Sequence, residues 1–124
     1  MKLHAAAASL VFAAFAAGGA FAHHAFSMYD NSKYVPLTGT VKTYVWKNPH
    51  VMIDFVATGA DGAPDAWSIE CSSPNIIGRH GWSSTSLKPG DKVSLVVHPM
   101  KDGSHIALMV KVTTTGGEVL KDKM

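Results

Sequence analysis

The strongest constraint on the fold is a series of short segments in which apolar residues alternate with polar ones. This period of two, rich in β-branched and aromatic side chains, predicts half-buried strands. Residues 59–64, with two glycines and a proline, and the turn Leu87–Asp91 are among the breaks between these segments. The predicted strands cover residues 38–46, 51–56, 67–71, 92–98 and 105–115.

One helical signal interrupts the strands, at residues 73–81. Ser73 is a suitable N-cap, Pro74 suits the first helical position, and Gly81 suits the end. Three strands, a short helix and two further strands form the order of the OB-fold, a five-stranded Greek-key barrel. An immunoglobulin-like sandwich would need about seven strands and usually has no helix there. We therefore expect a mainly β fold, a small OB-like barrel with one short helix between strands three and four.

The first 22 residues have the parts of a secretory signal peptide. Basic Lys2 precedes an apolar run over residues 5–17, and small residues follow at Ala20 and Ala22. The run is too short to span a bilayer, so we expect an exported protein, periplasmic or secreted, that does not span the membrane once the signal is removed. The expected organisation is a helical signal peptide over 1–22, an extended arm over 23–36 and the barrel over 37–124.

Removal of residues 1–22 leaves 102 of the 124 residues, enough for one small domain. Ten lysines and arginines then face nine acidic residues, which argues against nucleic acid as a partner. Cys71 is the single cysteine, so no internal disulfide forms, and we expect it to be a small buried hydrophobe. No nucleophile elbow is present, and Asp54 and Glu70 are two carboxylates without a nucleophile, so no enzymatic activity is expected.

Histidines carry the candidate chemistry. Cleavage after Ala22 would give His23 a free α-amine beside its imidazole, a chelating pair for a divalent transition metal, with copper favoured by the affinity order. Three histidines from distant parts of the chain, His50, His98 and His105, are expected at one rim of the barrel, where one of them could supply a further ligand. His24 is less suited to bind the same ion as His23, because adjacent side chains diverge in an extended backbone. The candidate metal ligands are His23, His50, His98, His105 and, less favoured, His24. The alternative for each rim histidine is a solvated strand-end residue.

The rim prediction depends on which residues of each strand face inward. We expect the inward series Val51–Ile53–Phe55, Val93–Leu95–Val97 and Ile106–Leu108–Val110, with His98 opposite either His105 or Ala107. A bulge would instead place the two histidines on opposite faces.

Two functions without a metal remain open. One is an OB-fold binding module whose aromatic residues Trp46 and Trp82 hold a peptide, a small solute or an envelope protein partner. The other is a structural envelope protein without a small ligand. Glu70 and Arg79 flank the expected helix and are a candidate ion pair.

Several short motifs together resemble one family of small exported bacterial proteins, domain of unknown function 6152. The resemblance implies an exported small β protein with no established activity, and it covers nearly all of the chain after residue 22. Cys71 departs from the family pattern, which expects a small residue without a thiol. The matching pieces are residues 23–26, 28–30, 46–50, 67–70, 73–75, 79–82, 87–91 and 98–103.

Overall fold

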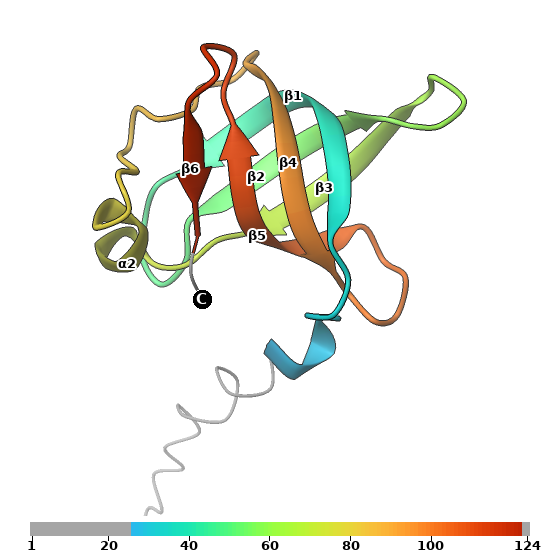
Figure 1. Ribbon diagram of the computed structural model, residues 1–124, viewed down its shortest axis with the longest axis horizontal. Coiled ribbons are helices and arrows are strands. Elements are labelled where there is room, and N and C mark those ends of the chain that lie inside the picture. Colours follow the sequence, from blue (N-terminus) through green and yellow to red (C-terminus); the bar gives the residue numbers. More distant parts are fainter. Residues whose placement is uncertain (1–25, 123–124) are drawn as a thin grey trace, which may run out of the picture.

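The computed structural model describes residues 26–122 (Figure 1). The expected signal peptide and the candidate ligands His23 and His24 lie outside these residues. The elements in chain order are the 3-10 helix η1 (Phe26–Met28), β1 (Val35–Val45), β2 (Met52–Thr58), β3 (Pro64–Glu70), α2 (Pro74–Gly78), β4 (Lys92–Pro99), β5 (Ile106–Thr113) and β6 (Val119–Lys121).

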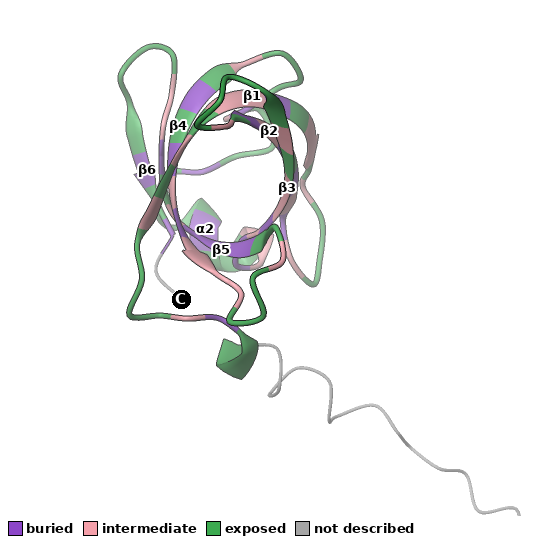
Figure 2. Ribbon diagram, turned by 90° about the vertical axis from the view of Figure 1, so that its right-hand side faces the viewer, coloured by how far each residue is buried: buried purple, intermediate pink, exposed green. Residues whose placement is uncertain are grey.

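The strands form a closed barrel with the expected connectivity. The sheet order is β3-β2-β1-β4-β5-β6, and a further parallel pairing of β3 with β5 closes the ring. Viewed end-on, β1 to β5 surround the core, α2 lies across the far end, and β6 lies outside the ring (Figure 2). The prediction of a mainly β, OB-like barrel with one short helix is confirmed, and the sequence analysis missed the short sixth strand and the 3-10 helix η1, which lies within the expected extended arm.

The barrel interior is filled by alternate residues of each strand. On β2 the inward residues Ile53 and Phe55 are 0% and 1% exposed, and Val51, just before this strand, is also buried, as the alternation predicts. Leu95 and Val97 of β4 face them from across the core. Ile77 of α2 and the nearby Trp82 close the end of the barrel, and the Trp82 indole N–H donates a hydrogen bond to the Lys121 carbonyl.

Gly39 marks the place where β1 passes from one partner strand to the other. It pairs with Ala57 of β2 on one side and with Val93 of β4 on the other. A Cβ atom at this position would lie 2.0 Å from the Val56 carbonyl oxygen, so only glycine allows the two backbones to approach this closely.

The prediction of the inward face of β5 is wrong. Ala107, Met109 and Val112 belong to the core, whereas Ile106 is 38% exposed and Leu108 is buried on the outer side. The cause is a β-bulge: the pairing shifts register between Val96 and Val97, so β5 carries one residue more than β4 there. The bulge inverts the face of every residue that precedes it.

The same bulge overturns both expected registers of His98. This residue lies opposite Leu108, and Pro99 takes the place opposite Ala107. His105 precedes β5 and contacts β3 instead.

Residues 26–34 cross the outside of the barrel. Tyr29 forms an isolated bridge with Met100, and the Asp30 N–H donates a hydrogen bond to the Pro99 carbonyl. This segment, which we call the arm, therefore lies against the β4–β5 connection (Figure 1). In the part of the chain that the structure describes, no helix is long and apolar enough to span a membrane.

Candidate functional site

His50 is held by contacts on both ring nitrogens. Its Nδ1 lies 3.1 Å from the Cys71 carbonyl oxygen, and its Nε2 lies 3.4 Å from Oε1 of Glu70. A carbonyl oxygen only accepts hydrogen bonds, so Nδ1 is the donor in the first contact and Nε2 is the nitrogen that faces the carboxylate. The Phe26 ring packs edge-on against the imidazole, with the ring centroids 6.4 Å apart.

The other oxygen of Glu70 is fixed as well. The Tyr29 hydroxyl donates a hydrogen bond of 2.8 Å to Oε2, which ties the arm to the end of β3. Burial, and then the bond to Glu70, raise the pKa of the Tyr29 hydroxyl, so it stays a donor. The expected ion pair of Glu70 with Arg79 does not form; the partners of Glu70 are Tyr29 and His50.

Glu70 belongs to a row of outward residues that crosses four strands. Met52 lies opposite Glu70, Glu70 lies beside Leu108, and Leu108 lies opposite His98. Neighbouring strands are about 4.8 Å apart, so the backbones of Glu70 and His98 are separated by about 10 Å. Leu108 fills the space between them, and His50 and His98 are therefore held in separate environments.

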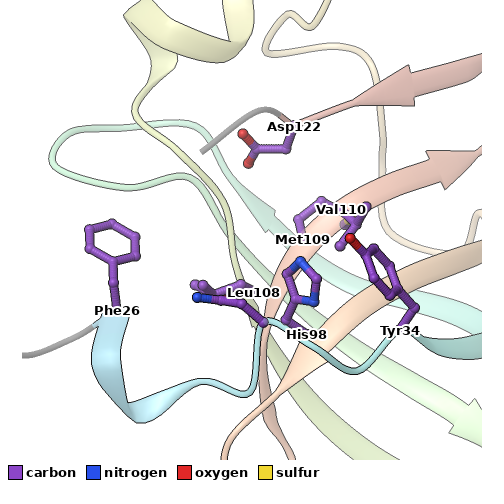
Figure 3. Close-up of a pocket in the computed structure, with 8 residues that line it drawn as sticks. Phe26, Tyr34, His98, Leu108, Met109, Val110 and Asp122 are labelled. Atoms are coloured by element: carbon purple, nitrogen blue, oxygen red, sulfur yellow. The ribbon is translucent and has the colours of Figure 1, made fainter.

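His98 lies beside a cavity on the outside of the barrel. Its Nδ1 is 2.6 Å from the Lys33 carbonyl oxygen, and the Tyr34 ring packs edge-on against it at a centroid distance of 4.7 Å. The cavity measures about 520 Å³ and lies between the arm, β5 and the chain end (Figure 3). Its lining residues are Phe26, Asn31, Tyr34, His98, Leu108, Met109, Val110 and Asp122.

Asp122 is the buried carboxylate of this cavity. The Ser72 hydroxyl donates to one of its oxygens and the Ser72 N–H to the other, each at 2.7 Å. Burial raises the pKa of Asp122, although these hydrogen bonds and the charges of His80 and His50 oppose the rise.

His105 is held on a different side of β3. Its Nδ1 lies 2.7 Å from an Asp65 oxygen, and its ring stacks on Trp67 at 4.5 Å with an interplanar angle of 10°. The other Asp65 oxygen accepts a hydrogen bond from the Trp67 indole. The groove that His105 lines shares no residue with the cavity beside His98, so the described contacts do not bring the three rim histidines together.

A family comparison covers most of this architecture. The model of a family of unknown function (DUF6152) matches residues 10–109. The chain belongs to this family. No curated protein and no solved structure matches the chain. The DUF6152 match includes His50, Glu70, His98 and His105, whereas Asp122 lies beyond it.

Three residues of this DUF6152 chain that were singled out in the sequence pack in or against the core: Cys71, Trp82 and Trp46. Cys71 is fully buried, as expected, and burial raises the pKa of its thiol, so the sulfur is protected from metals and oxidants. Trp82 is a core residue rather than a surface platform, because its exposed fraction is 3%. Trp46 packs against the core from the side and lies tilted against Tyr44.

Sequence reasoning did not identify the partners of the histidines. Glu70 and Tyr29 are 41 residues apart in the chain, and Ser72 and Asp122 are 50 apart. The available signal was the alternation of β3, in which Glu70 follows the inward residue Ile69 and so belongs to the outer face. Among residues 26–122, no three histidine, cysteine, aspartate or glutamate side chains are grouped as a metal site would require.

Proposed function

We propose that this protein is an exported metal-binding protein that takes up copper, or a similar divalent transition metal, at His50 and Glu70. The remaining ligands are the α-amine and imidazole of His23, made available when residues 1–22 are removed. The role is one of binding and handling the ion, not of catalysis.

The observation that carries the proposal is the orientation of His50. Histidines that bind metals through Nε2 commonly donate their Nδ1–H to a backbone carbonyl, as His50 does to Cys71. Glu70 is oriented in the same manner, by the hydroxyl of Tyr29. Neighbouring donors on one ion lie about 2.8 Å apart in square geometry and about 3.4 Å apart in tetrahedral geometry. His50 Nε2 and Glu70 Oε1 are 3.4 Å apart, so a small movement of either side chain allows both to bind one ion.

The length of the chain supports the participation of His23. The Phe26 ring touches His50, and three residues of chain span at most about 10 Å. An amine, two imidazoles and a carboxylate form an N,O donor set that suits Cu(II) in tetragonal geometry. The described residues then need to supply two ligands, so the proposal does not require a group of three among them.

The test is calorimetric titration of copper into protein whose mass shows that it begins at His23. His50→Ala is expected to lower the affinity at least tenfold, and so is one residue added before His23. His105→Ala is the matched control, because that ring lies in another groove. Circular dichroism confirms that each variant is folded. Unchanged affinity in His50→Ala or in the extended protein would refute the proposed site.

A further inference from the structure

Two hollows on the outside of the barrel form one groove along β5. The cavity beside His98 and a second hollow of about 420 Å³ share the lining residues Tyr34, Val110 and Asp122. The wall at one end is the aromatic ring of Phe26, and Leu108 and Val110 supply an apolar floor. Near the arm the groove therefore combines this apolar floor and aromatic wall with two polar side chains, Asn31 and His98.

The other end of the groove carries two lysines that face each other. The bulge in β5 turns Val110 and Lys111 outward together, and Lys111 pairs directly with Lys121 of β6. Directly opposite residues of an antiparallel pair share a face, with Cβ atoms about 4.5–5.5 Å apart, and like charges there destabilise the sheet. Both lysines line the groove, and Val96 lies beside them.

No carboxylate of residues 26–122 lies within ion-pair distance of either lysine amine. Asp122 also lines the groove, but both of its oxygens accept hydrogen bonds from Ser72. Burial raises the pKa of this carboxyl, and two lysines share this end of the groove with one carboxyl group. The paired lysines therefore leave a positive potential at one end of a groove whose floor is formed by Leu108 and Val110.

We infer that this groove binds a small amphipathic carboxylate, such as a medium-chain fatty acid. The carboxylate lies between Lys111 and Lys121, and the hydrocarbon tail lies on Val110 and Leu108 toward Phe26. Lys111 follows Leu108 by three residue steps along β5, a distance of about 10 Å, which suits a tail of this size. Both hollows fall within the usual volume range of small-molecule sites, about 300–1,000 Å³.

The proposed carboxylate site and the proposed copper site consist of different residues, so an experiment can refute one proposal without refuting the other. The experiment titrates octanoate into the chain that begins at His23 and is otherwise intact. A chelator is present, so that metal binding does not contribute to the signal. Octanol has the tail without the charge, and acetate has the charge without the tail. We expect octanoate to bind at least tenfold more tightly than either.

Lys111→Gln and Lys121→Gln are each expected to weaken octanoate binding at least threefold while the protein stays folded. Lys42→Gln is the matched control, since Lys42 is an exposed strand lysine that lines a different groove. Failure of octanoate to bind, equal binding of octanol, or unchanged binding in both lysine variants would overturn the inference.

Discussion

β2 and β5 are both rich in apolar residues and both contribute to the core, yet they bury their side chains in different ways. β2 alternates strictly, so Ile53 and Phe55 point inward and Asp54 between them is exposed. β5 buries three consecutive residues, Ala107 to Met109, of which the middle one faces outward beneath the arm. When one face of a strand is exposed to solvent, its polar residues indicate which face is the outer one. When both faces are covered, apolar residues occur on both and the sequence does not indicate the inner face.

The bulge decides which residues of β5 line the cavity beside His98. It places Leu108 and Val110 on the outer surface, where they line the cavity beside His98, and leaves Met109 in the core. Without the extra residue, the outer surface of β5 would carry Ala107 and Met109 instead. The irregular strand therefore builds the groove, and the regular strand builds the core.

The largest expected effect is at the centre of the regular strand. Phe55→Ala removes a ring that is 1% exposed and leaves a cavity in the barrel, so we expect a loss of about 3–5 kcal/mol in the free energy of unfolding. Urea denaturation followed by circular dichroism measures the loss. A cost below about 1 kcal/mol would contradict the position of Phe55 in the core.

The inverted face of β5 is tested by a pair of substitutions. Met109→Ala opens the barrel core and is expected to cost about 2–4 kcal/mol. Leu108→Ala removes contacts outside the barrel, under the arm, and is expected to cost about half as much. The same denaturation experiment compares them. If Leu108→Ala costs more than Met109→Ala, then the alternation continues through the bulge and the described register is wrong.

These two predictions also show what the sequence could and could not reveal. The strand order and the helix position followed from the alternation of apolar residues and from the turn residues. The inward residues of β2 also followed, because the charged side chain of Asp54 belongs on the solvent-exposed face and so places Ile53 and Phe55 on the inner one. Residues 106–110 of β5 are all apolar, so either face could have been the inner one. The bulge left no polar residue out of place, and sequence patterns alone could not locate it.

The candidate site shows the same limit. His50 was identified because it lies between a predicted turn and a predicted strand, and because an imidazole can bind a metal wherever it occurs in the sequence. Its partners depend on the pairing of Met52 with Glu70 and on the path of the arm, which brings Tyr29 to the end of β3. Such long-range pairs are fixed by closure of the barrel, and no local pattern encodes them.

A smaller effect is expected at Asp122, whose N–H donates a hydrogen bond to the Val110 carbonyl at the bulge. Because its pKa is raised in the folded protein, its proton stabilises the fold below the ordinary value of about 4, and this contribution is lost as the pH rises through the folded value. Asp122→Asn removes this dependence. The free energy of unfolding of the variant, relative to wild type, should therefore rise between pH 4 and 7.

Urea titrations at several pH values measure that difference. Loss of a Ser72 hydrogen bond shifts the whole curve but not its slope, so the slope is the informative quantity. A relative stability that falls with pH would mean that the folded protein lowers the pKa of Asp122.

The smallest effect is expected at Ile106, at the start of β5. Its side chain is 38% exposed, so Ile106→Ala should change the free energy of unfolding by no more than about 0.5 kcal/mol. Thermal unfolding compared with the wild-type protein is sufficient to measure it. A loss as large as that of Met109→Ala would place Ile106 inside the barrel.

The parallel closure of β3 with β5 has a consequence for how the barrel opens. The strand pairing of this seam has three residue pairs, from Ser68–Ile106 to Glu70–Leu108, and His105 extends it through its contacts with Asp65 and Trp67. We expect amide protons along so short a contact to exchange with solvent through local separation of the two strands, without unfolding of the remaining sheet. The arm fastens the seam through Tyr29 and Glu70, and an ion held by His50 and Glu70 would slow exchange there before it changed the melting of the whole domain.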